Sequence, residues 1–196
     1  MQMNKKLILA SASPRRRDIL TTAGYSYTVS VSNAAELTEA ESATELVRLN
    51  ALAKAREVFE REGISDCVVL GADTVVCLDE KILGKPNSRE DAFNMLKSLS
   101  GRTHEVISGY AVIGKGREES GACITEVHFK SLSDAEINCY LDTNEPFDKA
   151  GSYAVQEKAC LFVKGFTGDF FNIVGLPVSA VYEILLDFGI SPDWQA

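Results

Sequence analysis

The sequence lacks any apolar run long enough to cross a membrane. Its longest apolar stretches, such as residues 67–70 and 74–78, are far shorter than the roughly 20 residues that a membrane helix needs. The start of the chain is charged but leads into only a short apolar segment, residues 7–10, which is too short for the core of a signal peptide. We therefore expect a cytoplasmic protein with no membrane partner.

Paired cysteine motifs and an excess of positive charge are missing as well. The 5 cysteines form an odd set without a C-x-x-C pair, which indicates reduced and mostly buried thiols rather than a disulfide framework. The net charge of −8 disfavours a broad nucleic-acid surface, because phosphate backbones are held mainly by clustered Lys and Arg. An anionic ligand would have to be bound locally, where the few basic residues gather.

The patterns that are present predict a mixed α/β protein. A chain of 196 residues with 45% hydrophobic residues can bury a core as one domain, and no repeat or linker divides residues 1–196. Strand-like runs alternate with helical patterns in the first half, and a hairpin-like pair follows in the middle. The expected strands are 6–11, 25–31, 67–70, 74–78, 105–113 and 122–130; the expected helices begin near 13, 42, 88, 133 and 177. We expect a mixed twisted sheet with flanking helices.

Three arginines, Arg15 to Arg17, fall in the first turn of a predicted helix that begins at Ser13-Pro14. The positive end of the helix dipole disfavours a cation there by roughly 0.3–1 kcal/mol, so another interaction should compensate. Free N–H groups at a helix N-terminus, together with nearby Arg, form a strong anion site. The segment therefore predicts phosphate binding without a P-loop; the alternative is that the arginines pair with surface carboxylates.

An aspartate stands between two apolar strand-like runs, in Gly71-Ala72-Asp73-Thr74. A buried carboxylate is costly unless it is paired or binds a metal, which makes Asp73 a candidate ligand or base. The alternative is a bend in which backbone N–H groups satisfy the carboxylate. Lys54, Lys85 and Gln156 are weaker signals, since solvated lysines and an ordinary loop glutamine are the simpler interpretations.

Taken together, six ordered motifs resemble the Maf family across essentially the whole chain. They are Ser11-Ala12-Ser13-Pro14-Arg15-Arg16, Gly71-Ala72-Asp73-Thr74, Lys85-Pro86, the Ser100-Gly101-x-Thr103-His104 turn, Asp148-Lys149-Ala150-Gly151-x-Tyr153 and Val174-Gly175-Leu176-Pro177. The resemblance implies an elongated two-lobed domain with a central cleft, of the Maf/ITPase type. It also implies a house-cleaning nucleoside triphosphate pyrophosphatase that requires Mg²⁺ or Mn²⁺ and is often a homodimer.

The resemblance also assigns roles to individual residues. Asp73 matches the general base and Glu36 a second acidic residue, and these two carboxylates would hold the metal. The triphosphate would be held by Ser11, Arg15, Arg16, Lys54 and Lys85. Arg15, Thr74 and Gln156 match the branch that acts on dTTP and UTP. Other branches prefer 7-methyl-GTP or CTP-like substrates, and a nucleotide-dependent regulator of septum formation is a further alternative.

The chain departs from the usual family pattern at residues 49–51, Leu-Asn-Ala, where relatives often have Leu-Ala. None of its departures removes a proposed catalytic group.

Overall fold

The computed structural model describes residues 5–63 and 66–195, and in these ranges seven strands form one sheet. The order is β2-β1-β3-β5-β6-β7, with β4 paired to β3. β1 is parallel to both β2 and β3, and the other pairs are antiparallel. The mixed sheet is therefore as predicted. Its strands are β1 (Lys6–Leu9), β2 (Tyr27–Val29), β3 (Cys67–Leu78), β4 (Lys81–Leu83), β5 (Thr103–Gly114), β6 (Arg117–Phe129) and β7 (Val163–Thr167).

Two expectations about the strands were wrong, and two short strands were not predicted. Residues 67–70 and 74–78 belong to the single strand β3, which runs through Asp73 because residues 69–77 pair without a break with residues 105–113 of β5. The polar segment 114–121, expected as a connection, is a tight turn at Lys115 and Gly116 followed by the start of β6. β4 and β7 were not predicted. In each case pairing with a neighbouring strand overrides the weak local preference of glycine and polar residues.

The helices begin where their capping residues predict. Ser42, Ser88 and Ser133 each accept a hydrogen bond from the backbone N–H three residues on, which satisfies donors at the helix start. Gly63 ends α2 in the left-handed conformation, at φ 60°. The helices are α1 (Pro14–Thr22), α2 (Ala43–Glu62), α3 (Arg89–Leu99), α4 (Asp134–Leu141), α5 (Phe170–Val174) and α6 (Val178–Asp187); short 3₁₀ turns are η1 (Glu145–Asp148), η2 (Ala150–Ser152), η3 (Lys158–Phe162) and η4 (Asp193–Gln195).

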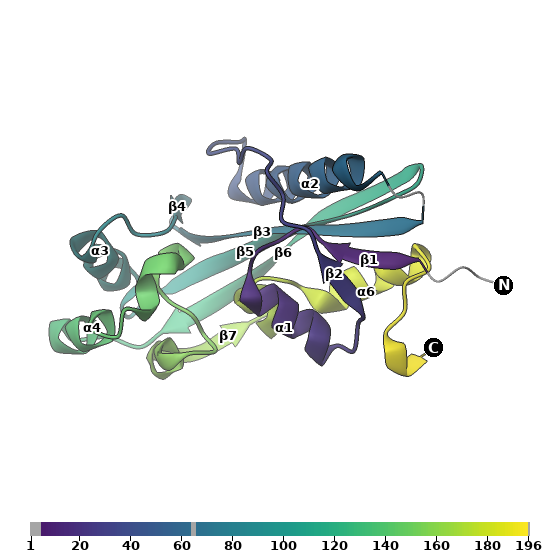
Figure 1. The fold of residues 1–196 in the computed structure, drawn as a ribbon. Coiled ribbons are helices and arrows are strands. Elements are labelled where there is room, and N and C mark those ends of the chain that lie inside the picture. Colours follow the sequence, from purple (N-terminus) through teal and green to yellow (C-terminus); the bar gives the residue numbers. More distant parts are fainter. Residues whose placement is uncertain (1–4, 64–65, 196) are drawn as a thin grey trace.

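The molecule is elongated along the long central strands (Figure 1). α2 lies along one face of the sheet, α1 and α6 lie on the other, and α3 and α4 sit at the end remote from both termini (Figure 1). One core joins β1, β3, α1 and α6, where Leu9, Leu20 and Leu185 are fully buried. Another joins α3 and α4 to the far half of the sheet around Leu96 and Ile137. These are the two lobes that the resemblance implies.

One edge of β3 is interrupted, and this interruption positions the site. β5 occupies the other edge along residues 69–77. On the interrupted edge, β1 pairs with residues 67–70 and β4 pairs with residues 76–78. Within the described chain, residues 71–75 therefore have no strand beside them on that edge. Because successive side chains of a strand point to opposite faces, Asp73 and Thr74 project from the two sides of the sheet at this gap.

The structure tests two expectations that were drawn from the composition, one about membrane helices and one about the cysteines. None of the helices in the described ranges is long and apolar enough to cross a bilayer. Cys67 and Cys77 are buried in the sheet as expected, but Cys139 and Cys160 are exposed. The expectation of mostly buried thiols was therefore wrong for these two, which lie on the short, largely solvent-facing elements α4 and η3.

Candidate active site

A cavity of about 750 Å³ opens at the gap in β3, between the two lobes. It draws on the start of α1, the middle of α2, the centre of β3 and the segment from η1 to Gln156. All nine residues predicted for the site line this one cavity: Ser11, Arg15, Arg16, Glu36, Lys54, Asp73, Thr74, Lys85 and Gln156. The fold thus brings together side chains that lie up to 145 positions apart in the sequence.

Lys54 joins the two predicted acidic residues. Its Nζ lies 2.8 Å from Asp73 Oδ1 and 2.6 Å from Glu36 Oε1. α2 can approach this closely because Gly71 and Gly109 lie beneath it: a Cβ at either position would collide with backbone carbonyl oxygens of α2. The two small residues therefore set the distance at which Lys54 reaches the carboxylate of Asp73.

The charges around Glu36 keep it ionised. Its pKa is lowered first by the hydrogen bond from Lys54, against a rise from partial burial, and further by the positive charges of Lys54, Lys85 and Arg16. Its side chain is 61% exposed, whereas those of Lys54 and Asp73 are both 14% exposed. The site therefore contains a largely buried ion pair between Lys54 and Asp73. The carboxylate of Glu36, in contrast, can be reached by solvent or a ligand.

Arg16 is locked in place by three neutral partners. Nε donates to the carbonyl of Gly175 at 2.8 Å, and the terminal nitrogens donate to Ser11 Oγ at 3.0 Å and Thr74 Oγ1 at 3.1 Å. Burial lowers its pKa to about 10, so the side chain stays charged at neutral pH. Since a guanidinium has five N–H donors, two remain beyond these bonds to described residues. Surface pairing with carboxylates, the alternative interpretation of the arginine run, does not apply to Arg16.

The start of α1 has the features of an anion site. Pro14 is the first helical residue and the first turn contains no acidic side chain. Ser13 occupies the N-cap position, but its side chain makes no capping bond; instead the Ser13 N–H donates to Ser11 Oγ at 3.2 Å. The N-terminal backbone of α1, Arg15 and Arg16 thus present positive potential to the cavity.

The opposite wall holds a lysine and an aspartate that were assigned no role from the sequence. Lys149 is only 6% exposed, and its Nζ donates to the Glu145 carbonyl and to Asp148 Oδ1, each at 2.7 Å. Burial acts to raise the pKa of Asp148, but the Lys149 hydrogen bond and the charges of Lys149 and Arg15 lower it. The carboxylate of Asp148 therefore interacts favourably with the positive charge of Arg15, and both residues line the cavity. The motif that contains Asp148 and Lys149 was recognised in the sequence, yet only the fold shows that both side chains line the cleft.

One backbone hydrogen bond joins two segments of this wall. The N–H of Gly151 donates to the carbonyl of Gly84 at 3.0 Å, which ties the η2 turn to the segment carrying Lys85. Lys85 and Gln156 both expose their side chains at the rim of the cavity. Both are therefore free to meet a ligand that enters.

Asn50 is a site residue that sequence reasoning missed. It is 3% exposed, and its Nδ2 donates to Asp73 Oδ2 at 3.1 Å. The same side chain makes two hydrogen bonds to the backbone of Leu37: its Oδ1 accepts from the N–H at 2.8 Å, and its Nδ2 donates to the carbonyl at 3.1 Å. Asn50 thus holds the segment that carries Glu36. The available signal was a polar residue one helical turn before Lys54, on the face that packs against the sheet.

Comparison with known proteins agrees with these features. Residues 6–188 match the family model described as Maf-like protein. The chain is 50% identical to the dTTP/UTP pyrophosphatase of Thermococcus onnurineus, over 94% of this chain and 99% of that protein. It is 44% identical to the dTTP/UTP pyrophosphatase of Bacillus pumilus, over 95% of this chain and 98% of that protein.

Among solved structures, a partial likeness is found to the Staphylococcus aureus Ham1 protein. The TM-score is 0.47 at 14% identity, covering 64% of this chain and 72% of that chain. The family match extends over both lobes and over every residue that lines the cavity. The chain belongs to the Maf-like protein family.

Proposed function

We propose that this protein hydrolyses dTTP and UTP to the nucleoside monophosphate and pyrophosphate. The observation that carries the proposal is the cavity at the gap in β3, where a lysine-bridged pair of carboxylates faces the arginines of α1. Relatives at 44–50% identity that bear the name dTTP/UTP pyrophosphatase support the choice of substrate.

In the proposed mechanism, Asp73 acts as the general base. Lys54 holds its Oδ1 and Asn50 holds its Oδ2, which orients the carboxylate while each oxygen keeps a lone pair. A water molecule transfers a proton to Asp73 as its oxygen forms a bond to the α-phosphorus. The bond from that phosphorus to the bridging oxygen breaks, and pyrophosphate leaves with the electron pair.

Positive side chains would stabilise the negative charge that builds up on the phosphates. Arg16 can direct its two remaining N–H groups at a phosphate oxygen pair, and Arg15 and Lys85 add charge from either side of the cleft. Phosphoryl transfer depends mainly on such positioning and charge stabilisation. We assign base recognition to Thr74 and Gln156, together with Arg15.

Asp73 and Glu36 are the residues that would hold a divalent metal. Within the described ranges no group of three or more His, Cys, Asp and Glu side chains could hold a metal ion, so two carboxylates are what the chain offers. Two carboxylates fit Mg²⁺, which commonly takes its other ligands from substrate phosphates and water. Bound there, Mg²⁺ or Mn²⁺ would polarise a phosphoryl oxygen and neutralise its charge.

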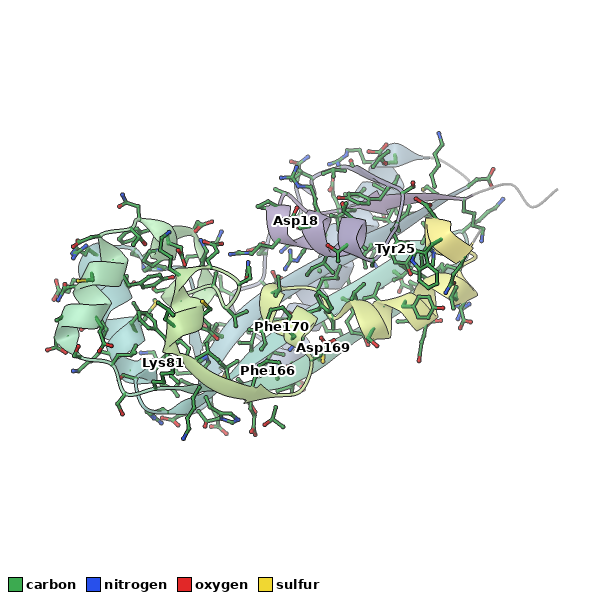
Figure 2. All side chains as sticks on the ribbon, turned by 90° about the horizontal axis from the view of Figure 1, so that it is seen from below. Asp18, Tyr25, Lys81, Phe166, Asp169 and Phe170 are labelled. Carbon is green, nitrogen blue, oxygen red and sulfur yellow. The ribbon has the colours of Figure 1, made fainter. Side chains whose placement is uncertain are left out.

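The test is pyrophosphate release from a panel of standard and modified nucleotides, with Mg²⁺ or Mn²⁺, for the wild type and Asp73→Asn. We expect turnover of dTTP and UTP, reduced about 10²-fold or more in the variant. Asp18→Asn is the matched control, because Asp18 lies on the exposed side of α1 (Figure 2). Preferred turnover of another base would reject the substrate, and no turnover of any nucleotide would reject the activity.

The cytoplasmic location and the homodimer belong to the same proposal. Both come from the sequence and its family resemblance. Light scattering coupled to size-exclusion chromatography would decide the dimer, and a mass of one chain at micromolar concentration would reject it.

A further inference from the structure

A buried serine lies directly behind Thr74, the residue to which we assign base recognition. Ser108 of β5 is the cross-strand partner of Thr74, and the two hydroxyl oxygens are 2.8 Å apart. Ser108 has no exposed surface and does not line the cavity. Its effect on a bound nucleotide must therefore be transmitted by Thr74.

The carbonyl of Asn172 fixes the direction of these hydrogen bonds. It lies 2.9 Å from Ser108 Oγ, and a carbonyl can only accept, so the single proton of Ser108 points to it. Ser108 must then accept from Thr74. The reverse arrangement would send the Thr74 proton to the Gly175 carbonyl, 3.4 Å away. It would also leave two acceptor oxygens 2.9 Å apart with no proton between them, so the first arrangement is favoured.

The Asn172 carbonyl is itself held rigidly. Asn172 is fully buried, and its Nδ2 donates to the Val106 carbonyl and to Thr125 Oγ1, each at 2.9 Å. Asp169 caps the start of α5 by accepting from the Asn172 N–H at 3.3 Å. Figure 2 shows Asp169 and Phe170 at this helix start, beside Phe166 of the edge strand β7.

The hydrogen-bonding capacity that the Thr74 hydroxyl has left decides which ligand groups it can bind. Its proton goes to Ser108, and one lone pair accepts from Arg16 at 3.1 Å. One lone pair is left for the cavity, which Thr74 lines. Toward a ligand Thr74 is therefore an acceptor only. It suits an N–H group and disfavours a phosphate oxygen or a bare ring nitrogen.

We propose that Ser108 is a positioning residue that holds the Thr74 hydroxyl as an acceptor, so that the site selects bases with a ring N–H. Uracil and thymine carry a hydrogen on N3, whereas cytosine presents a lone pair at the same position. This inference rests on the proposed function, and it explains in atomic terms how a pyrimidine site can separate UTP from CTP. A site built around such a bond rejects a mismatched partner because a buried polar group is left unsatisfied.

The test compares UTP and CTP in the wild type, Ser108→Ala and Ser108→Thr. Removing the Ser108 oxygen leaves the Thr74 proton with only the Gly175 carbonyl as an acceptor, at a long 3.4 Å. The proton can therefore turn toward the cavity and donate to N3 of cytosine. We expect the kcat/KM ratio for CTP over UTP to rise at least tenfold in Ser108→Ala. Ser108→Thr, which restores a hydroxyl, should return the ratio toward the wild-type value.

Binding of α,β-methylene-UTP and α,β-methylene-CTP, measured by calorimetry, gives a second readout that needs no turnover. Ser98→Ala removes a half-buried hydroxyl from α3 and should leave both ratios unchanged. The inference would be overturned if Ser108→Ala lowered kcat/KM equally for UTP and CTP. It would also be overturned if the wild type bound the two analogues with the same affinity. A wild type that binds the UTP analogue more tightly than the CTP analogue and yet hydrolyses neither nucleotide would overturn the proposed activity. That result would still support the role of Ser108 if Ser108→Ala reduces the difference in affinity between the two analogues.

Discussion

His104 should make the protein less stable as the pH falls from 6.5 toward 4. It is 2% exposed at the start of β5, its Nε2 lies 2.7 Å from the hydroxyl of Tyr153, and its ring meets those of Tyr153 and Phe129 edge-on. Nδ1 has no partner among the described residues. Burial, and secondarily the nearby His128, lower the pKa of His104 from its ordinary 6.5 to about 4.

The sign and size of the effect follow by linkage. Below pH 6.5, His104 binds a proton in the unfolded chain but not in the folded chain. The contribution of neutral His104 to stability is therefore complete above pH 6.5 and is lost as the pH falls toward 4. A shift of this size corresponds to about 3 kcal/mol over the whole window and about 2 kcal/mol by pH 5. Because His104 is almost completely buried, solvent screening should not reduce this figure much.

Urea unfolding of the wild type and His104→Gln, measured at intervals from pH 7.5 to 4.5, tests this magnitude. The variant is expected to be less stable than the wild type at pH 7.5, and the gap should narrow as the pH falls. His128→Gln, which replaces the only other histidine of the chain, should keep most of the pH dependence and lose only the secondary part that His128 contributes to lowering the pKa of His104. Parallel profiles for the wild type and His104→Gln would refute the argument, because carboxylate titration is common to both.

Three further predictions concern two residues that line the cavity and one glycine that lies beneath α2. Asn50→Ala loses two hydrogen bonds to Leu37 and one to Asp73; it should lower the free energy of unfolding by about 2–3 kcal/mol and lower kcat for dTTP and UTP alike. Gly109→Ala drives a Cβ into the backbone at Val47, and should cost about 1–3 kcal/mol in urea unfolding. Arg16→Lys cannot keep its three bonds, so kcat/KM should fall about tenfold or more.

Each variant has a matched control in the same chain. Asn33→Ala alters an exposed asparagine, Gly84→Ala adds a Cβ that meets nothing within 4 Å, and Arg17→Lys changes the exposed neighbour of Arg16. All three should behave like the wild type. The reasoning fails for Asn50 or Gly109 if unfolding matches that of the control, and for Arg16 if lysine preserves kcat/KM.

The sequence predicted those parts of the fold that depend on local signals. The serines at 42, 88 and 133 marked helix starts because a side-chain oxygen three residues before a backbone N–H acts within one turn. β7 could not be found in this way. Its Lys164 and Gly165 are poor strand formers, and the strand exists because it pairs with residues 126–129 of β6.

The site was visible where a residue contradicts its local setting. Asp73 in an apolar strand and Arg16 at a helix N-terminus are both unfavourable alone, and in the structure each is compensated by partners distant in sequence. Ser108 and Lys149 gave no such signal, and Asn50 gave only a weak one, as a polar residue on the face of α2 that packs against the sheet. An amide in a helix, a serine in a strand and a lysine in a loop are ordinary, so their importance depends on tertiary contacts.

The gap in β3 also separates two kinds of chemistry. Asp73, with Lys54 and Asn50, projects toward α2, whereas Thr74 and Ser108 project from the other face toward α1 and α5. Arg16 links the faces, since it donates to Thr74 and is attracted by the charge of Asp73. Changes behind Thr74 should therefore alter which nucleotide is chosen while leaving the Asp73 carboxylate oriented. Changes at Asn50 or Lys54 should slow the chemistry for every nucleotide alike, because these contacts orient the carboxylate and do not reach the base.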